Sequence, residues 1–97
     1  MDITVYKNGV HGDTSVMGCI GKVDDEVLKL IEVNQKMLYE CIKLCKPGVK
    51  FSNIGELCQQ IADENGYDMC NLFTAHGIGE LLHLAPSIHH SCENISI

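Results

Sequence analysis

The pattern of apolar and polar positions begins with a predicted β-hairpin. Residues 2–7 (DITVYK) are rich in the β-branched and aromatic types that favour strands. Asn8-Gly9 follows them, and this pair is the strongest short signal for a two-residue hairpin turn, because both turn positions need positive φ. Residues 10–20 are then predicted as the return strand, and Gly21 ends the hairpin.

Two helices are predicted next. Apolar residues recur at helical spacing from Val23 to Cys45, and the acidic residues 24–26 suit the positive end of the helix dipole. Pro47-Gly48 stops this helix. A second helix is predicted from Ser52, as N-cap, to Asn65, with Gly66 as the left-handed residue that ends it. The inward-facing positions are expected to be Val27, Leu30, Ile31, Leu38, Cys41, Ile42 and Cys45 in the first helix, and Ile54, Leu57, Cys58 and Ile61 in the second.

The last third of the chain reads as short segments at 67–70 and 72–74, followed by a turn at His76-Gly77-Ile78-Gly79. About two strands are then expected, over 81–83 and 87–92. The order of hairpin, two helices and further strands is typical of the α+β class with antiparallel pairing. A length of 97 residues allows one domain over 1–97.

Charge and composition exclude several classes of partner. The chain has 7 basic and 13 acidic residues, a net charge of −6, and no cluster of lysines, which argues against nucleic acid and anionic membranes. No apolar stretch approaches the roughly 20 residues of a membrane helix. The start, MDITVYKNGV, lacks the basic and apolar regions of a signal peptide, so a cytoplasmic location is expected.

The six cysteines are interpreted as small buried thiols in a reducing compartment rather than as a disulfide framework. One alternative is a tetrahedral zinc site that joins Cys41 and Cys45, spaced i and i+4, to His89, His90 and Cys92. No C-x-x-C pair is present, so polar residues on an edge strand are the favoured explanation of the histidines.

Two carboxylates are brought together by the hairpin. A two-residue loop pairs Thr4 with Asp13 and Asp2 with Ser15, so the two aspartates share a face as diagonal neighbours, roughly 7–8 Å apart or less. Such carboxylates repel unless a cation lies between them, and a divalent metal pair, typically about 3.5–4 Å apart, would fit. A three-residue loop would put them on opposite faces, and the alternative reading is a pair of solvent-facing acids.

His76 is the next candidate ligand. Apolar residues precede it and two glycines follow, so the ring could present one nitrogen to a metal while the other is held by a neighbouring acceptor. A purely structural histidine is the alternative. His83 follows seven residues later, and a strand over 81–83 could point it into the same cleft.

These residues carry a family resemblance. The segment Asp2–Ser15 resembles the first metal-binding segment of type I methionine aminopeptidases. Ala75-His76-Gly77-Ile78-Gly79, with His83 and Pro86, resembles their second. The segments between also match in order and spacing, including Lys46-Pro47-Gly48 and Asn65-Gly66-Tyr67. The resemblance covers essentially the whole chain.

The resemblance implies a partial pita-bread fold and the hydrolytic removal of the initiator methionine from nascent proteins. Asp2 and Asp13 would be ligands of two divalent ions, with Asp13 bridging them, and His76 would be the imidazole ligand. His83 would be the catalytic residue that hydrogen-bonds the substrate around the scissile amide. Leu82 would be a substrate-binding residue at a position where a pocket aromatic is common. Cobalt, manganese, iron or zinc would suit such donors.

The family domain is longer than this chain, so a further histidine and two glutamates of the complete site are expected outside these residues. The 97-residue chain alone is therefore expected to be inactive or nearly so, because part of the ligand set is missing. The partners implied are the N-terminus of a nascent polypeptide and the ribosome, and a targeting segment upstream of Met1 would make the location organellar. The alternative function is a non-catalytic binding or regulatory module derived from the pita-bread fold.

Overall fold

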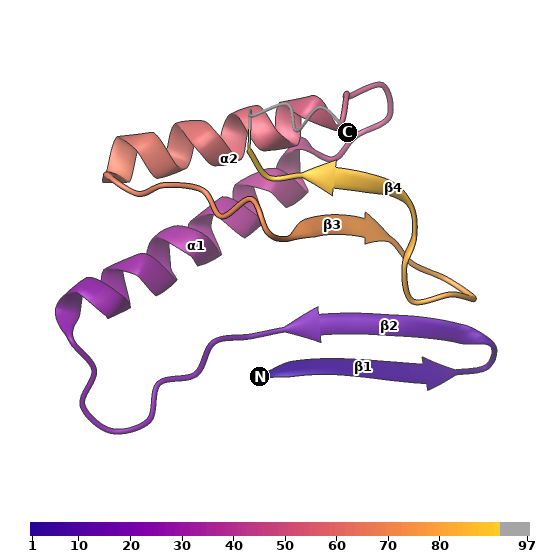
Figure 1. Cartoon of the computed structure of the whole chain (residues 1–97), viewed down its shortest axis with the longest axis horizontal. Coiled ribbons are helices and arrows are strands. Elements are labelled where there is room, and N and C mark those ends of the chain that lie inside the picture. Colours follow the sequence, from indigo (N-terminus) through magenta and orange to yellow (C-terminus); the bar gives the residue numbers. More distant parts are fainter. Residues whose placement is uncertain (92–97) are drawn as a thin grey trace.

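The structure is a computed structural model that describes residues 1–91 of the chain. Two antiparallel hairpins and two helices follow one another, which confirms the α+β prediction (Figure 1). The elements are β1 (Asp2–Lys7), β2 (Val10–Ser15), α1 (Asp25–Leu44), α2 (Ser52–Asn65), β3 (Thr74–Gly77) and β4 (Leu84–His89). The hairpin β1–β2 lies apart from the helices, while β3 and β4 lie beside them.

The first hairpin has the predicted turn and register. Asn8 and Gly9 have φ of 54° and 84°, so both turn positions are left-handed. Thr4 pairs with Asp13 and Asp2 with Ser15. The return strand ends at Ser15 rather than at residue 20, because its partner strand β1 begins at Asp2. Beyond the strands, the Val16 amide donates to the Met1 carbonyl and the Met1 amino group donates to the Val16 carbonyl.

The helices lie where they were predicted, except at one end. Helix α1 falls within the predicted range and α2 matches its range, with Gly66 in the left-handed conformation at φ 74°. The prediction of Ser52 as N-cap is wrong. Phe51 before it already has helical angles, and the Asn53 amide donates to the Lys50 carbonyl, so the turn begins earlier. Within the part of the chain that the structure describes, no helix is long and apolar enough to cross a membrane.

The core lies between α1 and α2. It consists of Val33, Met37 and Cys41 from α1 and Cys58, Ile61 and Ala62 from α2. The predicted inward positions Cys41, Cys58 and Ile61 are confirmed, but Val33 and Met37 were missed because the buried α1 ridge runs at intervals of four residues. Four predicted positions of α1 are instead 44–56% exposed: Val27, Leu30, Leu38 and Ile42.

The cysteines divide into buried and exposed groups. Cys41 and Cys58 are buried with their sulfurs 3.4 Å apart, a hydrogen-bond distance and well beyond the roughly 2.05 Å of a disulfide. Cys19, Cys45 and Cys70 are exposed, so the prediction of buried thiols is wrong for these three. Cys92 lies outside the described residues.

The second hairpin differs most from the prediction. His76 and Gly77 belong to β3 rather than to a turn, residues 81–83 form part of a loop, and β4 begins at Leu84. The ladder shifts register between His76 and Gly77, where Gly77 pairs with Leu84. A side chain at Gly77 would collide with the Ala85 carbonyl, so this close approach of β3 and β4 depends on a glycine.

Candidate active site

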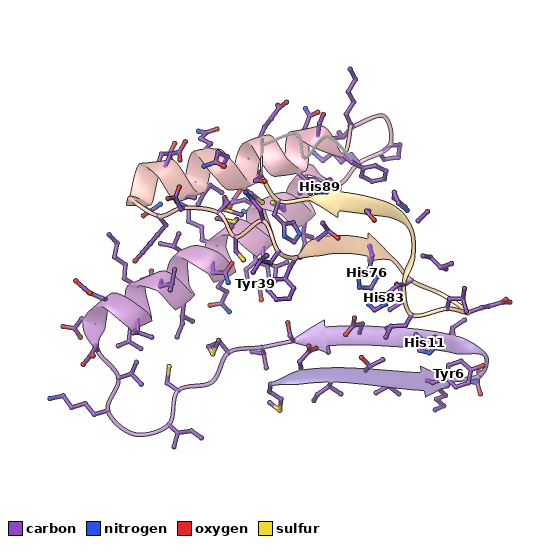
Figure 2. The ribbon with its side chains drawn as sticks, viewed as in Figure 1. Tyr6, His11, Tyr39, His76, His83 and His89 are labelled. Carbon is purple, nitrogen blue, oxygen red and sulfur yellow. The ribbon has the colours of Figure 1, made fainter. Side chains whose placement is uncertain are left out.

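Asp13 and His76 meet between the two hairpins. Asp13 lies on β2 and His76 on β3, and the Asp13 Oδ2 is 3.6 Å from the His76 Nε2. The side chains are 27% and 24% exposed, so a small ligand can reach both. Figure 2 shows His76 on the side of the second hairpin that faces the first. The structure thus brings together two of the predicted ligands from opposite ends of the sequence.

The carboxylate of Asp13 is oriented by its cross-strand partner. The Thr4 hydroxyl donates a hydrogen bond to the Asp13 Oδ1 at 3.3 Å. Thr4 and Asp13 are directly opposite in the ladder, so the bond holds the carboxylate on the face of the hairpin predicted from the sequence. With Oδ1 engaged, the second oxygen, Oδ2, faces His76.

The imidazole of His76 is oriented by the main chain. Its Nδ1 lies 2.9 Å from the Gly77 carbonyl oxygen. A carbonyl can only accept, so Nδ1 is the nitrogen that carries the proton, and in the neutral ring Nε2 holds a lone pair. A lone pair and a carboxylate oxygen then face each other, which is favourable only if a cation or a second ring proton lies between them. These donors therefore fit a metal ion.

His83 joins this pair from the loop between β3 and β4. Its ring meets that of His76 edge to face, with centroids 4.5 Å apart and planes at 79°. Figure 2 shows both rings between the hairpins. The sequence placed His83 near His76 through a strand over 81–83, whereas the structure does so through a loop. Leu82, the predicted substrate-binding residue, is half-buried in the same loop.

Asp2 lies on the same face of the hairpin as Asp13, as its pairing with Ser15 requires, and it is exposed. Among residues 1–91, no group of three His, Cys, Asp or Glu side chains is close enough to hold a metal ion, so Asp2 does not complete a cluster with Asp13 and His76. The zinc alternative gains no support from the same residues. The thiol of Cys45 instead donates to the Cys41 carbonyl at 3.2 Å.

His11 is a site residue that sequence reasoning missed. Its amide donates to the Gly79 carbonyl at 2.8 Å, and its ring Nδ1 lies 3.1 Å from the same oxygen. The alternation that placed Asp2 and Asp13 on one face also places His11 there, two residues before Asp13. That alternation was the signal that could have found it.

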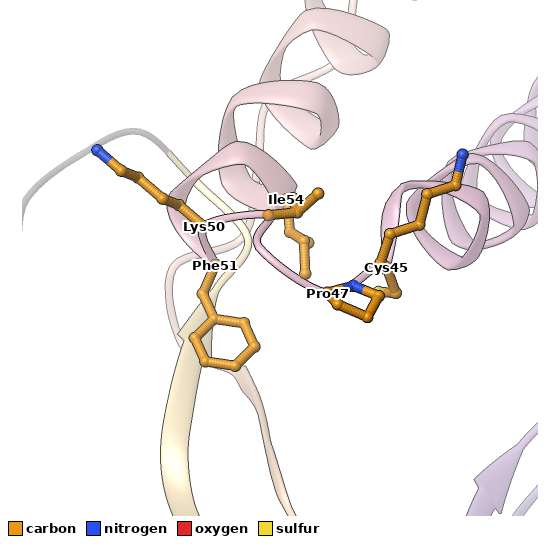
Figure 3. A pocket seen from close by; sticks show the side chains of 7 residues that line it. Cys45, Pro47, Lys50, Phe51 and Ile54 are labelled. Carbon is orange, nitrogen blue, oxygen red and sulfur yellow. The ribbon is translucent and has the colours of Figure 1, made fainter.

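Two hollows lie away from this site. One, of about 300 Å³, is lined by Cys45, Lys46, Pro47, Val49, Lys50, Phe51 and Ile54 (Figure 3). The other, of about 280 Å³, lies between α1 and the segment after α2, and His90 lines it together with Met37 and Tyr67. Burial lowers the pKa of His90, and the neighbouring charge of His89 lowers it further.

Comparison with known proteins decides the family. The model of metallopeptidase family M24 matches residues 1–96. The chain belongs to metallopeptidase family M24. It is 39% identical over 94 residues to methionine aminopeptidase 1D, chloroplastic/mitochondrial, of Arabidopsis thaliana, with 97% of this chain and 27% of the relative covered. It is 43% identical over 95 residues to methionine aminopeptidase 1D, mitochondrial, of Mus musculus, with 97% and 28% covered.

Solved structures of the same kind share the fold of this M24 chain. The Rickettsia prowazekii methionine aminopeptidase superposes with a TM-score of 0.90 at 35% identity, over 98% of this chain and 38% of that one. The Thermotoga maritima enzyme gives 0.89 at 27% identity, over 93% and 36%. The partial pita-bread fold is thereby confirmed, and the chain spans little more than a quarter of the first two curated relatives named above.

Membership of family M24 also bears on cofactors and location. The family is one of metallopeptidases, which implies the use of divalent metal, in agreement with the donors that Asp13 and His76 present. The relatives from Arabidopsis and mouse are named for chloroplasts and mitochondria. Those names lend some support to the organellar alternative.

Proposed function

We propose that this M24 chain supplies part of the metal centre and the substrate-facing wall of a methionine aminopeptidase, which removes the initiator methionine from nascent proteins. The observation that carries the proposal is the meeting of Asp13 and His76 between the hairpins, with His83 packed against His76. The names of the relatives point to the same activity.

Asp2, Asp13 and His76 would hold two divalent ions together with ligands from the rest of the domain. Carboxylate and imidazole donors accept cobalt, manganese, iron or zinc. When bound, such ions supply a nucleophile at neutral pH and polarise the substrate carbonyl.

The chain's own residues prepare the site for that chemistry. Thr4 fixes one carboxylate oxygen of Asp13, and the Gly77 carbonyl keeps the ring proton of His76 on Nδ1, which leaves Nε2 available as a donor. His83 is exposed beside His76, where its ring can hydrogen-bond the scissile amide of a bound N-terminus. Leu82 would contribute apolar surface for the methionine side chain. The partner would be the N-terminus of a nascent polypeptide at the ribosome.

The remaining ligands would come from the rest of the domain, so the 97-residue chain alone should turn over little or no substrate. The second candidate is a non-catalytic module, and the exposed apolar side chains favour it. Ile3 and Val5 on β1 and Leu38 and Ile42 on α1 are 46–56% exposed, and such surface invites association with another chain.

A graft separates the two candidates. Residues 1–97 would replace the matched segment of the Rickettsia prowazekii methionine aminopeptidase, which superposes over 98% of this chain. We call this protein the graft. Release of methionine from a Met-Ala-Ser peptide would be measured with added cobalt or manganese, together with metal affinity by calorimetry.

The graft should release methionine. Asp13→Asn and His76→Gln should each weaken metal binding by more than the roughly 10–100-fold that loss of an outer-shell partner costs. Asp25→Asn, which changes an exposed carboxylate at the start of α1, is the matched control and should have no effect. A folded graft without activity would overturn the proposal and favour the non-catalytic module. Activity that survives Asp13→Asn would contradict the metal assignment.

The location is a separate part of the proposal. The relatives named for mitochondria and chloroplasts lead us to favour a mitochondrial or plastid site over the cytoplasm. A fluorescent fusion to the full product of the gene, imaged with organelle markers, would test this. Diffuse cytoplasmic signal would contradict it.

A further inference from the structure

His11 links the first hairpin to the loop that carries His83. Its main-chain amide and its ring Nδ1 lie 2.8 and 3.1 Å from one acceptor, the Gly79 carbonyl. Because that oxygen can only accept, both nitrogens act as donors and the ring proton resides on Nδ1. Gly79 lies in the loop between β3 and β4, a few residues before His83.

This link matters because the two hairpins share no ladder. Strands β1 and β2 form one two-stranded sheet and β3 and β4 another. Within residues 1–91, no helix or strand outside the first hairpin packs closely against it. The position of β2 relative to β3 therefore depends on individual contacts such as His11–Gly79 and Asp13–His76.

The His11–Gly79 and Asp13–His76 contacts differ in whether they are favourable without a bound ion. The His11–Gly79 contact pairs donors with an acceptor and is favourable without any ligand. The Asp13–His76 contact brings a carboxylate oxygen to a ring nitrogen that lacks a proton in the neutral form, so it is favourable only if a cation or a second ring proton lies between the two atoms. His11 and Asp13 lie on the same face of β2, two residues apart, so a bond at His11 also limits the movement of Asp13.

Tyr6 supports the ring of His11 from the opposite strand. The two residues pair in the ladder, and their ring centroids are 4.7 Å apart with planes at 48°. Figure 2 shows both rings near the tip of the hairpin. The imidazole is therefore placed by a ring contact on one side and by the Gly79 carbonyl on the other.

We propose that His11 is a positioning residue that sets the separation of Asp13 from His76 and so prepares the metal centre before any ion binds. The inference rests on the proposed function, because it assumes that Asp13 and His76 are ligands. It assigns to His11 no contact with metal or substrate.

Two substitutions in the graft isolate the ring donor. His11→Phe keeps a ring against Tyr6 and removes the Nδ1–H. His11→Asn removes the ring but places an amide N–H near the position of Nδ1. Thr14→Val, on the opposite face of β2, is the matched control. Cobalt affinity would be measured by calorimetry, kcat and KM on Met-Ala-Ser, and the protonation of the His11 ring by its ¹⁵N chemical shifts.

His11→Phe should weaken cobalt binding on the order of tenfold, the low end for an outer-shell partner, and lower kcat more than it raises KM. His11→Asn should restore most of the affinity, and Thr14→Val should change none of these values. The ¹⁵N shifts should show a protonated Nδ1 in the metal-free graft.

An unprotonated His11 Nδ1 would overturn the inference, and so would a cobalt affinity that is unchanged in His11→Phe. Equal losses of cobalt affinity in the Phe and Asn variants, together with lowered melting temperatures, would also overturn it, because they would indicate a structural role only. A graft that binds cobalt but releases no methionine would overturn the proposed function alone, and His11 would still be judged by affinity and ¹⁵N shifts. A graft that binds no cobalt would overturn both.

Discussion

The Asp13 Oδ2 and the His76 Nε2 lie 3.6 Å apart although the strands that carry them belong to different sheets. A neighbouring group orients each side chain. The Thr4 hydroxyl donates to the Asp13 Oδ1, and the His76 Nδ1 lies against the Gly77 carbonyl oxygen. The pair is thus oriented by local hydrogen bonds, so removal of those bonds should weaken metal binding without unfolding the domain.

The Thr4–Asp13 bond offers the simplest test. Thr4→Val keeps the shape of the side chain and removes the hydroxyl that donates to the Asp13 Oδ1. In the graft, metal affinity by calorimetry should fall by roughly tenfold, because outer-shell partners orient the ligands. Thr14→Val makes the same change on the opposite face of β2 and should leave the affinity unchanged. Equal behaviour of the two variants would contradict the orienting role.

The turn of the first hairpin should tolerate little change. Gly9 has a φ of 84°, so Gly9→Ala should destabilise the graft by about 1–2 kcal/mol, the cost of a left-handed alanine. Gly12→Ala is the matched control, since Gly12 lies in the strand with no positive φ and with open space where the added methyl group would project. Urea unfolding followed by circular dichroism measures both. Equal stabilities would contradict the requirement for a left-handed residue at position 9.

The sequence predicted best what a few adjacent residues decide. Asn8-Gly9 alone dictates a two-residue turn, and from that turn the register Thr4–Asp13 follows by counting. Gly66 ended α2 as predicted for the same local reason. Val33 and Met37 were missed because α1 has apolar residues on several faces, and only packing against α2 selects which of them is buried.

The site was predictable in its members but not in its assembly. Spacing and resemblance identified Asp13, His76 and His83. The 3.6 Å distance between the Asp13 Oδ2 and the His76 Nε2, however, depends on how two separate sheets are placed, and no periodicity in the sequence predicts that placement. The predicted strand at 81–83 failed because Gly77 lets the Ala85 carbonyl come close and shifts the β3–β4 ladder. Strand alternation places His11 on the face of Asp13, but its role was missed because its partner, the Gly79 carbonyl, is a main-chain oxygen that no residue type marks.

Gly77→Ala should disturb the site directly. The added methyl group would overlap the Ala85 carbonyl, so β4 must move away from the residue that follows His76. The free energy of unfolding of the graft should fall by about 1–3 kcal/mol, the usual cost of overpacking, and its metal affinity should fall as well. Gly79→Ala is the milder control, because its methyl would meet only the flexible end of Leu84 at 3.3 Å. Comparable urea midpoints for the two variants would contradict this interpretation.

The α1–α2 core should respond to loss of volume. Ile61 is 4% exposed, and Ile61→Ala should cost about 2–5 kcal/mol through lost burial and the cavity left behind. Gln60→Ala, next to it on the exposed side of α2, removes only a helical hydrogen bond to Glu64 and should cost a few tenths of a kcal/mol. Urea unfolding of both grafts gives the difference. A small effect of Ile61→Ala would mean that this core is not formed.

His90 should make the fold sensitive to acid. Burial, reinforced by the neighbouring charge of His89, lowers the pKa of His90 in the folded state below the value of about 6.5 expected for the unfolded chain. Well above pH 6.5 the ring is neutral in both states and contributes nothing to the pH dependence. As the pH falls below 6.5, the unfolded state takes up the proton first, so stability is lost until the folded pKa is passed.

His90→Gln removes this proton uptake. The unmodified graft should therefore lose more stability between pH 7.5 and pH 5.5 than the variant does, and the free energy of unfolding in urea at each pH measures both. His89→Gln should reduce that loss only in part, because burial is the larger cause. Equal pH dependence in the graft and its His90→Gln variant would contradict the assignment.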